Sequence, residues 1–83
     1  MTKLSIAVNE EAASRGTERV LAILEYLGRF RTGQSASEIA RALSLPVNTV
    51  GRITETMCNR GWLYRREDDR RFVLTNRVAD LTR

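Results

Sequence analysis

Apolar residues recur at helical spacing in three segments of this chain. The first segment spans residues 17–31 and places its apolar side chains on one face: Val20, Ile23, Leu24, Leu27 and Phe30. Gly16 interrupts the pattern before it, and Thr17 can serve as an N-cap. We therefore expect a helix from about Thr17 to about Arg31, with its apolar stripe in the protein core.

A second, shorter helix is predicted within "QSASEIARALSLP". Ser35 and Glu38 have the spacing of a capping box, although Ser37 would make an equally good N-cap. The inward face of this helix is expected to hold Ile39, Ala40 and Leu43. The segment Ser44-Leu45-Pro46 ends it.

The third helix is expected from about Val47 to Arg60, with Pro46 in its first turn and Gly61 as its C-terminal stop. Its inward residues are Val50, Ile53 and Met57. Two helices joined by so short a turn are typical of a helix-turn-helix.

A β-hairpin should follow, because "WLYRR" and "RFVL" are strand-like and are separated by the polar turn "EDDR". If Arg66 pairs with Arg71, one face of the hairpin holds Leu63, Phe72 and Leu74, and the other holds Tyr64 and Val73. The last segment, "TNRVADLTR", has room for a short helix capped by Thr75 or Asn76. The predicted fold is therefore mainly α with a small β-hairpin, a winged helix-turn-helix.

The length of 83 residues allows one domain at most. We expect residues 1–16 to form a flexible N-terminal arm with a helical turn at most. Residues 17–75 would form the domain, and residues 76–83 a short C-terminal helix or tail. No apolar run approaches the roughly 20 residues needed to span a bilayer, and the first residues do not resemble a secretory signal.

The composition argues against an enzyme and against bound cofactors or metals. The chain has one cysteine, Cys58, and no histidine, so it lacks the usual zinc ligands and the commonest general base. No pair of carboxylates has a spacing that indicates a catalytic cleft. A single cysteine also excludes an internal disulfide.

Charge is distributed unevenly along the chain. Fourteen basic residues, thirteen of them arginine, oppose ten acidic residues, and the excess of +4 lies wholly in residues 41–83. Arginine binds phosphates and guanine edges through two hydrogen bonds, so this bias favours a nucleic-acid surface over ordinary solubilising charge.

Several short motifs resemble the DNA-binding domain of isocitrate-lyase-regulator-type (IclR-type) bacterial repressors. They are "VLAILEYL", "SEIA", "LPVNTVGRI", "GWLYR" and "FVL", which together cover about residues 17–78. The hairpin "RREDDRR" followed by "LT" is also similar to the multiple-antibiotic-resistance-regulator (MarR) type. Both resemblances imply the same geometry on double-stranded DNA.

The chain departs from the IclR-type pattern in two respects. That family carries a large effector-sensing domain that is not part of these 83 residues, so the resemblance implies no small-molecule effector here. Gly51 stands where the family usually has a larger side chain facing DNA. A glycine inside a helix costs roughly 1 kcal/mol relative to alanine, which leaves two interpretations: close approach of a backbone, or a lost base contact.

The candidate DNA contacts lie at the start of the third helix and in the hairpin. Asn48, Thr49 and Arg52 occupy the outward face of the helix, where helix-turn-helix proteins meet base edges. The alternative for Arg52 is an ion pair with Glu55 or Glu38. Gly51 and, as a possible phosphate donor, Ser37 complete this part of the site.

The hairpin adds four arginines around three carboxylates: Arg65, Arg66, Arg70 and Arg71. Like charges on Arg66 and Arg71 would face each other across the strands, which is unfavourable unless something neutralises them. We expect a phosphate to do so, with Arg70 and Arg71 contacting the DNA backbone or the minor groove.

The sequence thus predicts a cytoplasmic, nucleoid-associated transcription regulator of bacterial or phage origin, a repressor by its resemblance. The alternative is a protein-interaction module that reuses the winged-helix fold. A weak homodimer is expected, because apolar residues near both termini have little core to fill: Leu4, Ile6, Val8, Val78 and Leu81.

Overall fold

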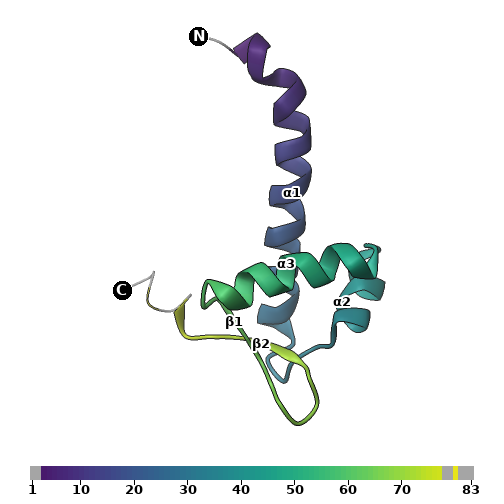
Figure 1. Cartoon of the computed structure of the whole chain (residues 1–83), viewed down its shortest axis with the longest axis vertical. Coiled ribbons are helices and arrows are strands. Elements are labelled where there is room, and N and C mark those ends of the chain that lie inside the picture. The colour runs from purple at the N-terminus through teal and green to yellow at the C-terminus, as the bar shows by residue number, and fades with distance from the viewer. Residues whose placement is uncertain (1–2, 78–79, 81–83) are drawn as a thin grey trace.

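The computed structural model describes residues 3–77 and Asp80, with side chains from Ser14 onward. Its elements follow in the order α1 (Lys3–Arg29), α2 (Ala36–Leu43), α3 (Val47–Asn59), β1 (Leu63–Arg65) and β2 (Phe72–Leu74). Figure 1 shows α2 and α3 beside the C-terminal half of α1, with the hairpin below them. The predicted winged helix-turn-helix is confirmed.

Helix α1 begins earlier than the sequence indicated. It runs without interruption from Lys3 through Gly16, so the predicted start at Thr17 was wrong and the expected flexible arm is helical from Lys3 onward. The residues on both sides of Gly16 include good helix formers, Ala12 and Arg15 before it and Glu18 and Arg19 after it, and one glycine inside such a run does not stop propagation. The N-terminal part of α1 projects well beyond the rest of the molecule (Figure 1).

The end of α1 also differs from the prediction. The helix stops at Arg29, two residues early, and Phe30 is 42% exposed instead of belonging to the core. Its ring packs against Tyr26, with 4.7 Å between the ring centroids. The phenol of Tyr26 in turn donates a 2.8 Å hydrogen bond to the side-chain oxygen of Gln34. Phe30 therefore packs against Tyr26 at the surface and does not belong to the core.

The core gathers residues from all three helices and the hairpin. Ile23, Leu27, Ile39 and Val50 are completely buried. The other buried apolar residues among those whose side chains are described are Ala40, Met57, Leu63 and Phe72. Burial of each large aliphatic side chain is worth about 1.5–3 kcal/mol, so this cluster fixes α3 against the rest of the fold. The predicted inward faces of α2 and α3 are confirmed, with Leu43 and Ile53 half-buried at the edge.

The turn of the helix-turn-helix is closed by backbone hydrogen bonds. Ser44 adopts the left-handed conformation, with φ of 56°, and its N–H points back to the carbonyls of Ala40 and Arg41. Pro46 is the N-cap of α3 and so lies just before the first turn in which we expected it. Gly61, with φ of 85°, follows α3 and lets the chain turn into β1, as predicted.

The hairpin has the register that the sequence indicated. Leu63 faces Leu74, Tyr64 faces Val73, and Arg65 faces Phe72. An isolated antiparallel bridge adds Gln34, in the loop after α1, to the side of β2: Gln34 and Phe72 exchange two backbone hydrogen bonds, of 2.8 and 3.1 Å. Strand β2 is therefore hydrogen-bonded to β1 on one side and to the segment just before α2 on the other.

The chain beyond β2 is described only in part. The hydroxyl of Thr75 accepts a hydrogen bond from the N–H of Arg77, as a cap would, and the N–H of Asp80 donates to the carbonyl of Asn76. Val78 and Leu81, which we expected to meet a partner chain, lie outside the described residues. Within the described part of the chain, no helix is long and apolar enough to cross a membrane.

Candidate nucleic-acid interface

The outward face of α3 presents the residues that the sequence singled out. Asn48 and Arg52 are exposed, one helical turn apart, while Thr49 and Gly51 beside them are half-buried. Val50 anchors this turn from below, since it is completely buried in the core. The start of α3 is thus packed against the core through Val50 and exposes the polar side chains of Asn48 and Arg52 on its outer face.

Arg52 forms no ion pair with any residue that the structure describes. The two acidic partners considered for it are not engaged with it: Glu38 pairs with Arg71, and Glu55 has no ion pair within the described chain. A guanidinium on an exposed helix face without an internal partner keeps its five donors available to a ligand. The guanidinium of Arg52 is thus exposed and is not engaged by any carboxylate of the described residues.

Two of the hairpin arginines form ion pairs with carboxylates of the protein itself. Arg71 forms two hydrogen bonds to the carboxylate of Glu38, Nη1–Oε1 at 2.6 Å and Nη2–Oε2 at 3.2 Å, and a third to the carbonyl of Gly33. Arg66 pairs with Asp69 at 3.2 Å and donates to the carbonyl of Thr32. Carboxylates of the chain therefore relieve the repulsion between the two arginines that we expected a phosphate to relieve.

Glu38 is central to this arrangement. Its carboxylate accepts the N–H of Ser35 at 2.9 Å while Ser35 Oγ accepts the N–H of Glu38, which completes the predicted capping box. The hydrogen bond from the Ser35 backbone, followed by that from Arg71, lowers the pKa of Glu38 below its ordinary value. Ser35, and not Ser37, is the N-cap; Ser37 stands exposed in the first turn of α2.

The other two hairpin arginines remain on the surface. Arg65 lies over the ring of Phe72, with 5.0 Å from its guanidinium carbon to the ring centroid, which holds its stem against the hairpin. Arg70 is exposed at the tip in a left-handed conformation, with φ of 62°, and has no ion pair among the described residues. These two side chains can reach outward without breaking an internal contact between charges.

The family model for the IclR helix-turn-helix domain matches residues 16–67, which is more than half of the chain. The chain belongs to the IclR helix-turn-helix family. No match is found among curated protein sequences. Membership in this family means DNA-binding transcription regulation, with double-stranded DNA as the partner.

The packing of this IclR-type domain does not require a glycine at position 51. A Cβ atom built at this position would meet no atom within 4 Å beyond its own helix, so packing does not require a glycine. It borders a cleft between α3 and the hairpin, together with Glu55, Asn59 and Arg65. The space above Gly51 is therefore open to a ligand that approaches from outside.

One buried polar residue was not predicted from the sequence. Thr54 is completely buried between Val50 and Met57 on the inward face of α3. Its hydroxyl donates a 2.8 Å hydrogen bond to the carbonyl of Val50, which removes the penalty of burying it. Its helical spacing from Val50 and Met57 could have placed Thr54 on the inward face of α3.

Cys58 lies next to the cleft and is half-buried. Burial raises the pKa of its thiol, an effect that the charge of Arg65 opposes in part. A thiol with a raised pKa is a poor nucleophile at neutral pH.

Proposed function

We propose that this IclR-type domain is a sequence-specific repressor of bacterial or phage origin that acts by occupying an operator. In this proposal α3 enters the major groove of double-stranded DNA. The observation that carries it is the state of Arg52, which is exposed on the outer face of α3 while Glu38, a potential partner, is engaged by Arg71. The charge of Arg52 is therefore free to meet DNA.

Each residue of the outer face has a role suited to its chemistry. Arg52 would donate two hydrogen bonds to a guanine edge, and Asn48 would pair with an adenine. Thr49 would contact a phosphate or a thymine methyl group. Ser37, exposed in the first turn of α2, would donate to a phosphate at that helix terminus. Gly51 would allow the DNA backbone to come close to α3.

The hairpin arginines divide between two tasks in this proposal. Arg70 and Arg65 would contact the sugar-phosphate backbone or line the minor groove. Arg66 and Arg71 would orient the hairpin without contacting DNA themselves. Arg71 pairs with Glu38 of α2, and Arg66 pairs with Asp69 and donates to the carbonyl of Thr32 in the loop after α1. Neutralised phosphates release counterions, so binding is expected to weaken steeply with added salt.

The protein would act in the bacterial cytoplasm, at the nucleoid, as a weak homodimer. A single module of this kind buries only about 600–1,000 Å² on DNA, which favours two copies on a palindromic site. The α3 helices of the two copies would lie one helical turn of DNA apart, about 34 Å. The N-terminal part of α1, which extends beyond the rest of the molecule, offers a surface for this contact (Figure 1).

A selection from random or genomic duplexes, followed by gel-shift titration at several salt concentrations, tests the proposed function. The expected outcome is an enriched motif that is bound more tightly than a scrambled duplex, with affinity falling as salt rises. Failure to bind any duplex at low salt, or equal binding to all of them, would contradict a sequence-specific repressor.

A further inference from the structure

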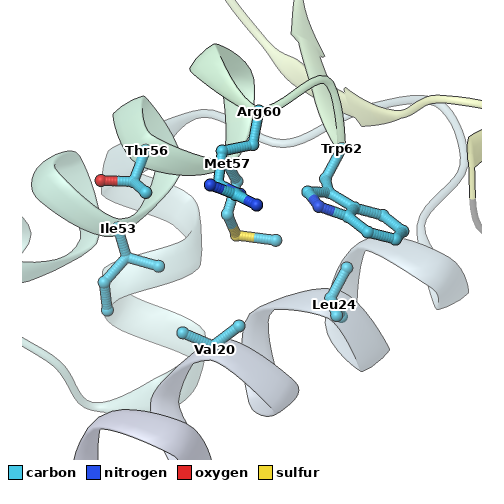
Figure 2. Close-up of a pocket in the computed structure, with 7 residues that line it drawn as sticks. All are labelled: Val20, Leu24, Ile53, Thr56, Met57, Arg60 and Trp62. Carbon is cyan, nitrogen blue, oxygen red and sulfur yellow. The ribbon is translucent and has the colours of Figure 1, made fainter.

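A second concave site lies on the side of α3 that faces α1. It is a cavity of about 420 Å³ lined by residues of α1, of α3 and of the segment that follows α3: Val20, Leu24, Ile53, Thr56, Met57, Arg60 and Trp62. Figure 2 shows the two α1 side chains directed toward Met57, with the indole of Trp62 closing one end. The volume falls within the range of small-molecule sites, about 300–1,000 Å³. Neither Asn48 nor Arg52 lines it.

The aromatic wall of this cavity is held in place from several directions. The backbone N–H of Trp62 donates to the carbonyl of Met57 at 2.8 Å, and its carbonyl accepts the N–H of Thr75 at 3.0 Å. The guanidinium carbon of Arg77 lies 5.1 Å from the centroid of the indole ring. A flat indole beside aliphatic side chains suits a flat apolar body.

The charged residue at the rim is Arg60. Its side chain is exposed, it lies beside Met57 and Trp62 in Figure 2, and it forms no ion pair with any carboxylate of the described residues. The cavity thus combines apolar walls with the positive charge of Arg60 at its mouth, and the guanidinium of Arg77 lies against the indole that forms one wall. That combination is complementary to an apolar molecule with a single negative group at one end.

We propose that this cavity binds a small aromatic carboxylate, with the ring between Leu24 and Trp62 and the carboxylate on Arg60. The site is independent of the DNA-binding face. Its walls belong both to α3 and to the segment that leads into the hairpin, so a bound molecule would contact both parts of the winged helix at once.

Nuclear magnetic resonance titration of the full chain with 2-naphthoate tests the proposal, with its uncharged analogue 2-naphthamide as the matched ligand. Trp62 is the single tryptophan, so its indole N–H gives one identifiable signal. Naphthoate is expected to shift this signal in a saturable way and to bind several-fold more tightly than the amide. No saturable shift, or equal affinity for both molecules, would overturn the proposal.

Two charge-removing variants locate the carboxylate. Arg60→Gln should weaken naphthoate about fivefold, the upper range for an ion pair that stays partly in water, and should leave the affinity for the amide unchanged. Arg41→Gln, on the exposed side of α2 and away from the cavity, removes the same charge and should change neither affinity. Equal effects of the two variants would show nonspecific charge attraction and would contradict a site at Arg60.

Discussion

Arg71 of the hairpin and Glu38 of α2 are joined by two parallel hydrogen bonds, at 2.6 and 3.2 Å. The same carboxylate accepts the N–H of Ser35, so one residue caps α2 and holds the hairpin. This relationship fixes the hairpin relative to the helix-turn-helix. In the proposed complex, a hairpin with a fixed orientation would place Arg70 and Arg65 against DNA while α3 occupies the major groove.

The lowered pKa of Glu38 predicts how stability depends on pH. Its contribution is fully present above the ordinary carboxyl pKa of 4.5 and is lost as pH falls through the lower pKa of the folded state. Glu38→Gln keeps the capping box but removes the charge. We expect this variant to unfold at a lower temperature than the unmodified protein at pH 7. The gap between them should narrow below about pH 4.5.

Thermal unfolding followed by circular dichroism from pH 3 to pH 7 measures that gap. Asp68, whose pKa is lowered chiefly by the N–H of Asp69, titrates in the same direction in both proteins and cancels in the comparison. A gap that stays constant over the whole range would show that the Glu38 charge does not stabilise the fold.

Gly33 lies where the loop after α1 meets the hairpin, with φ of 101°. A Cβ here would come within 3.0 Å of Val73 Cγ1 and 3.1 Å of Arg71 Cβ. Gly33→Ala should therefore destabilise the protein by more than about 1 kcal/mol, measured by urea unfolding. Gly16→Ala is the matched control: it lies inside α1 with no neighbour within 4 Å, and it should stabilise by up to about 1 kcal/mol. Equal effects of the two variants would refute this distinction.

Gly51→Ala separates folding from DNA binding. The open space around Gly51 predicts a rise in the free energy of unfolding of about 1 kcal/mol, because alanine is the better helix former. If the DNA backbone approaches Gly51 closely, affinity for the selected duplex falls in the same variant, and this is the result we expect. A more stable protein with unchanged affinity would instead indicate that a base contact has been lost at this position.

The sequence predicted those parts of the fold that depend on local patterns. Apolar spacing located α2, α3 and the hairpin register, and the capping box identified the start of α2. The start of α1 was missed because one glycine was given more weight than the helix formers around it. The Glu38–Arg71 pair joins residues 33 positions apart, so no local pattern could reveal it. Without that pair, Arg71 was interpreted as a phosphate contact.

Dimer formation is expected to be weak in solution and stronger on DNA. Sedimentation at tens of micromolar should show some dimer, and a palindromic duplex should bind two copies cooperatively. Deleting residues 1–12, which removes the N-terminal part of α1, should abolish the cooperativity. Monomer alone in solution, together with binding of one copy per palindrome, would contradict the dimer.

The central claim is that Arg52 reads the DNA sequence, while the hairpin contacts the sugar-phosphate backbone or the minor groove without reading sequence. The measurement that tests it is the affinity of Arg52→Ala and of Arg70→Ala for the selected duplex and for a scrambled duplex, over a range of salt concentrations. Both variants remove one exposed arginine without breaking an ion pair between described residues.

Arg52→Ala is predicted to lose roughly 1–3 kcal/mol on the selected duplex and clearly less on the scrambled one. Arg70→Ala is predicted to weaken both duplexes alike and to reduce the salt slope by about 1. An equal loss on both duplexes for Arg52→Ala, or no loss at all with the fold intact by circular dichroism, would show that the outer face of α3 does not read DNA sequence.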